Sequence, residues 1–329
     1  MCPLPPPSHA VTTSPRSRRP SPLFLLVIGA AYLALLLYID RGNGILARLA
    51  SHAGALGVCG ALVLVSFGVR YQRWRLALAA QGHAHIGWWA GLVAYLAGFA
   101  FTVSPGKAGE LLRIRYFGRM SVPPAQVLAA FIFERGLDLA SLTLLGIAAA
   151  TLIPAFGALA GLVLGLLLAL CLASCWPWLQ RRLSALAARF PGYRLRRLAS
   201  FLVNGVTQAG PLLRPLLATQ GLVLGALAWL LTAAAFTHLC HAIGLILTWQ
   251  QALGIYPLAM LAGAASFVPG GVGTTEAAIV LMLGALGAPL DVSLAVAVGI
   301  RLASLWLAIA IGMLAMLSLE VGSQRERGR

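Results

Sequence analysis

Charged side chains are rare in this sequence, and several of them lie within or beside long apolar stretches. An ionisable side chain at membrane depth costs several kcal/mol and marks a functional site by default. We expect such residues to form a polar cavity that binds a charged headgroup, with carboxylates that exchange protons. The alternative is a buried ion-pair network that only fixes the helices. The candidates are Lys107, Glu110, Arg113, Glu134, Arg135, Asp138, Glu276 and Arg301.

The spacing of these residues places several of them on common helix faces. Glu110 and Arg113 are three positions apart, and Glu134 and Asp138 are four apart. Residues at either spacing are neighbours on a helix surface. Two adjacent carboxylates disfavour joint ionisation unless an arginine or a ligand cation balances them. Arg135 and Arg301 are the arginines expected to do so.

Two Pro-Gly sequences interrupt apolar stretches, and each is followed by one of these glutamates. The first, FAFTVSPGKAGE, ends at Glu110, and the second, AASFVPGGVGTTE, ends at Glu276. Proline ends a helical hydrogen-bond ladder and glycine permits a sharp turn, so each sequence predicts a break. Such backbone must face protein or a watery cavity. The half-helix after each break presents free N–H groups that suit an anion, above all a phosphate. The predicted break residues are Pro105, Gly106, Gly109, Pro269, Gly270, Gly271 and Gly273.

The similarity between the two breaks extends downstream. Arg135 precedes a Leu-Ala-Ser-Leu sequence at 139–142, and Arg301 is followed by the same four residues at 302–305. The distance from the proline to this sequence is 34 residues in the first copy and 33 in the second. Inverted-topology repeats of this kind place a transporter's substrate near the midplane, at interrupted helices. Chance similarity in a chain rich in Ala and Leu is the alternative.

Composition defines the class of protein. The 329 residues are 60% hydrophobic and 10% charged, whereas a soluble domain carries about 25% charged residues. This excludes a soluble globular enzyme and a disordered chain, and it indicates a membrane protein. The net charge of +16 would suit nucleic acid. The basic residues, however, form short runs between apolar stretches, which is the positive-inside pattern, so no nucleic-acid partner is expected.

We predict an all-α polytopic membrane protein with about six full transmembrane helices and two re-entrant helical hairpins. The predicted full spans are 23–39, 53–69, 124–150, 156–176, 216–243 and 292–319. The hairpins enter through 87–103 and 250–268 and return after the two breaks. Residues 1–22 are expected to form a disordered cytoplasmic tail, 23–319 the membrane domain, 177–215 a basic cytoplasmic connector, and 320–329 a second cytoplasmic tail.

Charge placement favours the re-entrant topology, with both termini in the cytoplasm. Of the 24 basic residues, nineteen then lie on the cytoplasmic side and two, Arg41 and Arg48, lie outside. Three remain at membrane depth, namely Lys107, Arg135 and Arg301. The sequence RYQRWR at 70–75 is expected to end the second span as a cytoplasmic basic boundary.

The sequence contains no recognisable motif for nucleotide hydrolysis or metal chemistry. Gly106-Lys107 is followed by Ala108 instead of Ser or Thr, so the sequence holds no P-loop. HExxH, GxSxG and acidic metal-binding runs are absent from the sequence as well. We therefore expect no catalytic residue, no metal and no cofactor, and a protein that is not an enzyme.

These motifs resemble one known family. The chain resembles the lysylphosphatidylglycerol synthase transmembrane (flippase-like) domain family over roughly 23–319. The resemblance rests on three motifs: Pro105, Gly109 and Glu110; Glu134-Arg135-x-x-Asp138; and VPGGVGTTE at 268–276 followed by Arg301. The resemblance implies a multi-pass protein of the bacterial inner membrane that moves a lipid between leaflets. Two-domain members carry a soluble aminoacyl-transferase domain after the membrane region. About ten residues follow the last span here, so we expect the membrane region alone.

The leading hypothesis is a lipid translocase without its own ATPase. Lys107, Arg135, Arg301 and the half-helix N-termini would hold a phosphate, while Glu110 and Glu276 would contact a headgroup amine or shuttle protons. One alternative is an enzyme acting on lipid phosphates, with Ser104, Thr274 or Thr275 as nucleophile. Another is a non-transporting scaffold for an envelope glycosyltransferase. Expected partners are anionic, aminoacylated or polyprenyl-linked lipids. A lipid-modifying enzyme, a glycosyltransferase and a second copy of the chain remain open as protein partners.

Overall fold

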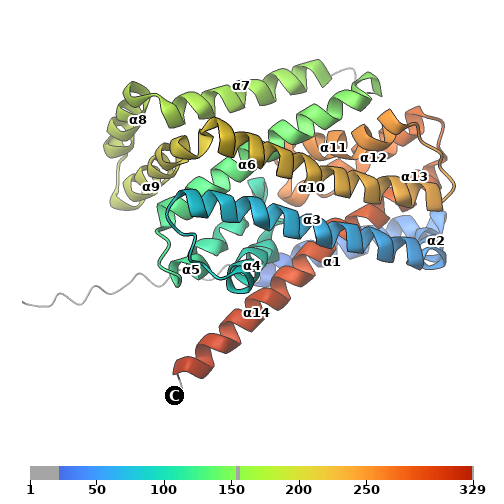
Figure 1. Cartoon of the computed structure of the whole chain (residues 1–329). Coiled ribbons are helices and arrows are strands. Elements are labelled where there is room, and N and C mark those ends of the chain that lie inside the picture. The colour runs from blue at the N-terminus through green and yellow to red at the C-terminus, as the bar shows by residue number, and fades with distance from the viewer. Residues whose placement is uncertain (1–21, 153–155, 328–329) are drawn as a thin grey trace, which may run out of the picture. The chain divides into compact units, whose positions relative to one another are not determined.

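A computed structural model describes residues 22–152 and 156–327, and every regular element in these ranges is a helix (Figure 1). The all-helical prediction is therefore confirmed for this part of the chain. The predicted tail at 1–22 lies outside the described residues except for Pro22. The chain divides into two compact units, residues 1–38 and 39–329. The candidate residues all belong to the second unit.

Within the described ranges, four helical segments are long and apolar enough to cross a membrane. They are α3 (Ala53–Ala80), Gly157–Cys175 within α7 (Phe156–Cys175), α10 (Pro215–Ala242), and Leu290–Gln324, which combines three consecutive elements. These three are α13 (Leu290–Arg301), the π-helical turn η6 (Leu302–Trp306) and α14 (Leu307–Arg327). Two further predicted spans are the helices α1 (Pro22–Asn43) and α6 (Pro124–Gly146), and α6 carries three charges in its middle.

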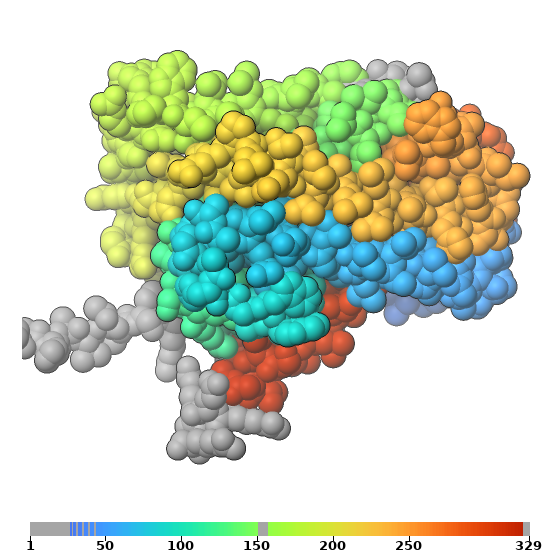
Figure 2. Space-filling view, in the orientation of Figure 1, coloured from blue at the N-terminus to red at the C-terminus, as the bar shows by residue number. Residues whose placement is uncertain are grey.

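Helices α3 and α10 form the centre of the second unit. They run antiparallel, because the Cys59 thiol donates to Ala235 O at 3.1 Å near one end of α3 while Arg73 packs at Gly225 near the other. A Cβ atom at position 225 would lie 2.6 Å from Nη1 of Arg73, so glycine here leaves room for the guanidinium. Figure 1 shows the two helices side by side, and Figure 2 shows their side chains closely packed on this face, with α7 along its upper margin.

The helices of this unit share two ends. At one, which we name the α2 end, Arg48 of α2 (Ile45–Ser51) pairs with Asp291 at the start of α13, with 2.5 Å between Nη2 and Oδ2. At the other, the α5 end, Arg115 of α5 (Arg113–Gly118) pairs with Glu320 near the end of α14 at 2.9 Å. Figure 1 shows α2 and α13 on one side and α5 on the opposite side.

The predicted basic connector forms two helices at the α5 end. They are α8 (Pro177–Arg189) and α9 (Tyr193–Ala209), followed by the short turn η4 (Gly210–Leu213). Gly205 of α9 packs directly on Leu128 in the first turns of α6. The arginines of α8, at 181, 182 and 189, are exposed.

Short elements surround the two Pro-Gly sequences. The first region comprises α4 (Trp88–Ala97), η1 (Gly98–Phe101), η2 (Pro105–Leu112) and α5, and the second comprises α11 (Trp249–Ala265), η5 (Pro269–Gly271) and α12 (Thr274–Ala285). Within η2 the backbone leaves the helical region at Gly106 and Lys107, with φ of 58° and 57°. It does so again at Gly270 in η5, with φ of 63°. The helices are thus interrupted at the Pro-Gly positions. The remaining described helical turn is η3 (Ile147–Leu152), which follows α6.

Candidate functional site

The two interruptions meet inside the second unit. Elements η2 and η5 are in contact, and Gly270 lies against Val103. A Cβ atom at position 270 would sit 2.7 Å from a Val103 methyl group, and the positive φ of Gly270 independently favours glycine. Two segments separated by more than 160 residues in the chain thus lie together, and the charged residues around both belong to one site.

Glu110 follows the first break and is fully buried. One of its oxygens accepts a hydrogen bond from the Thr102 hydroxyl at 2.8 Å. The other lies 3.1 Å from Nη2 of Arg113 and 3.8 Å from Nη2 of Arg135. The Ser104 hydroxyl accepts from the Gly109 N–H at 2.5 Å and closes the turn between them. Both carboxylate oxygens of Glu110 therefore already have partners.

Glu276 has the corresponding position after the second break. It accepts the Gly273 N–H at 2.8 Å, at the start of α12, and the Nε–H of Arg301 at 2.9 Å. Arg301 also donates from Nη2 to the carbonyl oxygen of Gly270. The Glu276–Arg301 pair consequently ties the second break to both α12 and α13.

The two carboxylates of α6 form the most heavily paired cluster of the site. Glu134 lies 3.0 Å from Arg113, 3.3 Å from Arg73 and 3.4 Å from Arg135, and it accepts the Tyr95 hydroxyl at 2.5 Å. Asp138 lies 2.7 Å from Arg73, 3.1 Å from Arg135 and 3.3 Å from Arg70. Charge-assisted hydrogen bonds of this kind compensate the cost of removing the ions from water.

Arg70 and Arg73 were expected at a cytoplasmic helix boundary, and this expectation is wrong. Helix α3 continues to Ala80, and the two residues are only 7% and 1% exposed. Arg113, which the charge count also placed in the cytoplasm, is fully buried. Their partners explain the difference, because the α6 carboxylates neutralise them and aromatic faces cover them. Arg70 lies 4.3 Å from the Trp229 ring centroid, and Arg113 lies 3.9 Å from that of Tyr95.

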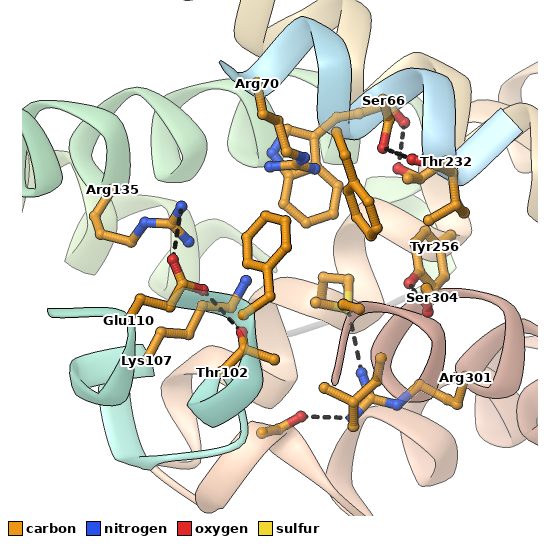
Figure 3. A pocket seen from close by; sticks show the side chains of 18 residues that line it. Ser66, Arg70, Thr102, Lys107, Glu110, Arg135, Thr232, Tyr256, Arg301 and Ser304 are labelled. Atoms are coloured by element: carbon orange, nitrogen blue, oxygen red, sulfur yellow. Dashed lines mark hydrogen bonds and ion pairs between the residues drawn. The ribbon is translucent and has the colours of Figure 1, made fainter. Parts of the chain in front are cut away.

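A polar cavity of about 80 Å³ lies where the breaks meet α3, α6, α10, α11 and the π-helical turn η6. Four of the predicted residues line it, namely Lys107, Glu110, Arg135 and Arg301, and Figure 3 shows them around the opening. The other polar residues of the wall were not predicted from the sequence as part of the site. These are Ser66, Arg70, Thr102, Thr232, Tyr256 and Ser304.

The remaining predicted residues are not part of this wall. Arg113 and Glu134 lie behind it in the ion-pair network, and Glu276 is reached only through Arg301. Asp138 faces a neighbouring groove instead. Serine and threonine hydroxyls in an apolar stretch give no sequence signal of their own. Arg70 and Arg73 did give a sequence signal for burial, because their three-residue spacing continues the helix face of the second span.

The neighbouring groove is apolar and has a volume of about 290 Å³. It runs between α6, α7 and α11, and leucines such as Leu139, Leu142, Leu159 and Leu162 line it. Five residues line both spaces, so the polar cavity and the apolar groove adjoin. These are Lys107, Arg135, Trp229, Met260 and Gly270.

Lys107 lies at this junction with its charge unpaired. Within the described residues its ammonium group has neither an ion pair nor a hydrogen bond, although its backbone N–H bonds to Ser104 O at 2.9 Å. Its φ of 57° is uncommon for a residue other than glycine. Arg301 also has one amino group without an oxygen partner, because Nη1 meets only the Met260 sulfur at 3.9 Å. The junction therefore presents positive charge to whatever enters it.

Among the described residues, no three His, Cys, Asp or Glu side chains come together as a metal site would require. The profile of one protein family, the lysylphosphatidylglycerol synthase TM region, matches residues 23–312. Comparison with the curated proteins gave no match.

Proposed function

The chain belongs to the lysylphosphatidylglycerol synthase transmembrane-region family and is a multi-pass membrane protein, and from this premise we propose that it moves a phospholipid or a polyprenyl-linked lipid between the leaflets of the plasma membrane. The observation that carries the proposal is the junction of a charged cavity with an apolar groove. The protein does so without an ATPase of its own, as a translocase and not as an enzyme.

The two spaces match the two parts of a lipid. The polar cavity, of about 80 Å³, is lined by arginine and lysine side chains that can pair with the phosphate of a headgroup. The apolar groove, of about 290 Å³, can take part of an acyl or prenyl chain. Helix α7 forms one wall of that groove, and its leucines at 162, 164, 166 and 168 are exposed, as expected of a surface that faces lipid. A lipid can thus place its head in the cavity while its chains stay in the bilayer.

The first break belongs to a re-entrant hairpin. Helix α4 and η1 have 10 and 4 residues, which rise about 23 Å, less than the roughly 30 Å of a bilayer core. The loop before α4 and the residues after α5 lie together, because His83 bonds to Gln126 at 2.5 Å. The segment therefore enters and leaves at the α5 end. The arginines of α5 and α8 are also at this end, which supports a cytoplasmic location for it and for the end of α14.

The second break supports an inverted repeat of the first. Helices α11 and α12 have 17 and 12 residues, and the chain after α12 reaches Asp291 at the opposite, α2 end. Each copy pairs the glutamate after its break with an arginine farther along. Glu110 lies 3.8 Å from Arg135, and Glu276 lies 2.9 Å from Arg301. In such folds one repeat rocks against the other and exposes the site to each side in turn.

Of the three hydroxyl groups considered as nucleophiles, those of Ser104 and Thr274 have structural partners. The Ser104 hydroxyl accepts the Gly109 N–H, and Thr274 donates to Gly271 O at 3.1 Å. Neither hydroxyl is paired with a carboxylate that would activate it, as nucleophilic catalysis requires. This favours transport over hydrolysis of a lipid phosphate.

A leaflet assay in proteoliposomes tests the proposal. Purified protein is reconstituted with a fluorescent phospholipid, and a membrane-impermeant quencher reports movement of that lipid between leaflets. We expect wild-type protein and the Arg182→Ala control, which is altered on the exposed α8, to move lipid at equal rates. We expect Arg301→Ala and Glu276→Gln to move lipid at least tenfold more slowly than wild type. Equal rates in all four proteins, or in protein-free vesicles, would contradict the proposal. Thermal melting of each variant separates loss of transport from loss of folding.

A further inference from the structure

We infer that the lipid bound at this junction carries a net negative phosphate headgroup, and that the site excludes headgroups whose amino groups make them net positive, such as an aminoacylated phosphatidylglycerol. The inference rests on the proposed function in one respect, that the occupant is a lipid. It departs from the expectation that Glu110 and Glu276 contact a headgroup amine.

The charges in and around the cavity do not balance. Six cationic side chains meet four carboxylates, so two positive charges are in excess among the described residues. The cations are Arg70, Arg73, Lys107, Arg113, Arg135 and Arg301. The carboxylates are Glu110, Glu134, Asp138 and Glu276.

An excess of buried positive charge calls for an anion. A buried ion without a partner is strongly unfavourable, and more so at membrane depth. A phosphate monoester carries about −1.5 to −2 at pH 7, which is nearly equal and opposite to the excess. A phosphodiester carries one negative charge and offsets half of it. A headgroup with a net positive charge would raise the excess further.

The excess positive charge lies in the polar cavity, at and near its junction with the apolar groove. Lys107 has no ion pair within the described residues, and Nη1 of Arg301 meets only the Met260 sulfur. Arg135 faces both spaces, and its Nε lacks a hydrogen-bond partner. In Figure 3 the side chains of Lys107 and Arg135 come from neighbouring elements toward the same opening. Lys107 and Arg135 are thus available to the oxygens of a phosphate at the junction, and Arg301 adds a third positive charge to the wall of the same cavity.

Every carboxylate of the site is already paired with at least one arginine, although Oε2 of Glu110 and Oδ2 of Asp138 make ion pairs without a further hydrogen bond. Glu110 is held by Thr102, Arg113 and Arg135, and Glu276 by Gly273 and Arg301. Asp138 contacts three arginines and accepts the Trp229 indole N–H at 3.3 Å. An ammonium group would have to displace an arginine from one of these sites. The site therefore selects its ligand by charge sign.

The test compares lipids that share dioleoyl chains and differ only in headgroup. Full-length protein in detergent micelles is titrated with phosphatidate, phosphatidylglycerol, lysylphosphatidylglycerol and diacylglycerol at equal mole fraction, and a separate titration uses inorganic phosphate. Binding is followed by tryptophan fluorescence and by the shift in melting temperature. We expect phosphatidate to bind at least tenfold more tightly than diacylglycerol, phosphatidylglycerol to be intermediate, and lysylphosphatidylglycerol to be no tighter than diacylglycerol. Binding of lysylphosphatidylglycerol within threefold of phosphatidate would overturn the inference.

Inorganic phosphate distinguishes a lipid site from a free-anion site. We expect it to have no effect at concentrations where phosphatidate saturates, because it leaves the groove empty. An effect equal to that of phosphatidate would refute the lipid part of the inference.

Variants of Lys107 locate the selectivity. Lys107→Met should weaken phosphatidate binding about tenfold, since a charge-assisted hydrogen bond is lost, and leave diacylglycerol binding unchanged. Lys107→Arg should retain most of the preference. Arg181→Met, the same kind of change on the exposed α8, should behave as wild type. An unaltered phosphatidate preference in a folded Lys107→Met protein would overturn the assignment of the site.

The outcomes separate this inference from the proposed function. If the headgroup preference is found but no lipid crosses in the leaflet assay, translocation is refuted and the inference stands. If lipids cross but the aminoacylated lipid binds and crosses as well as phosphatidate, the inference is refuted and translocation stands.

Discussion

Replacing Glu134 by glutamine removes the carboxylate on which three arginines converge. Arg73, Arg113 and Arg135 lie within 3.0 to 3.4 Å of its oxygens, and the side chain is 1% exposed. Glutamine keeps the shape and the hydrogen-bonding length of the side chain, so packing is nearly unchanged. The change isolates the effect of the charge.

The expected loss is large because the arginines remain buried. Removing one partner of a buried ion pair costs about 3–5 kcal/mol, since an uncompensated charge is left behind. Arg73 and Arg135 retain Asp138, at 2.7 and 3.1 Å, and Arg113 retains Glu110 at 3.1 Å. These remaining contacts favour the lower end, so we expect Glu134→Gln to reduce the free energy of unfolding by about 3 kcal/mol.

The assay is reversible unfolding in mixed micelles, with the fraction of SDS as denaturant and tryptophan fluorescence as the signal. Glu320→Gln is the matched control, because Glu320 is 27% exposed and pairs with Arg115 at the α5 end. Such a pair contributes less than about 1 kcal/mol. The double variant Glu134→Gln with Arg73→Met restores the original charge excess and should recover part of the loss. A loss for Glu134→Gln no larger than that of Glu320→Gln would refute the assigned network.

Two further predictions concern the breaks. Gly270→Ala should destabilise the protein by about 1–3 kcal/mol in the same unfolding assay, because alanine is strained at a φ of 63° and its methyl group meets Val103. Gly284→Ala is the control, because the space around Gly284 is open. An equal loss of stability in the two variants would contradict the contact between Gly270 and Val103. In a background without the native cysteines, Arg119→Cys should react with an impermeant maleimide only from the cytoplasmic face, and Leu290→Cys only from the outer face. Reaction of both cysteines from the same face would contradict the re-entrant topology.

The class of protein and its family were predictable from the sequence because they rest on local properties. Apolar stretches gave the helical spans, and the positions of Pro105 and Pro269 coincide with interruptions, since a proline cannot extend a helix wherever the chain folds. The match over residues 23–312 confirms the family expected from the motifs. These features do not depend on which helices become neighbours.

The surroundings of the charges could not be predicted in the same way. Arg70 and Arg73 look like a boundary, because arginines at the end of an apolar run usually face water. Only the neighbouring position of α6 makes their burial favourable. Glu276, in contrast, was expected to contact the ligand, but its partners Gly273 and Arg301 place it behind the cavity wall. Tertiary contacts, which a single sequence does not contain, decided both cases.

The π-helical turn at Leu302–Trp306 is a hinge in the long helix that follows the second break. Such a turn holds one more residue than an α-helical turn and recurs at functional positions. Here it begins directly after Arg301, and its own Ser304 and Leu305 line the cavity. The helix on either side is regular, so bending concentrates at this turn. A small tilt of α13 relative to α14 would therefore shift the Arg301 guanidinium within the cavity wall without unwinding either helix.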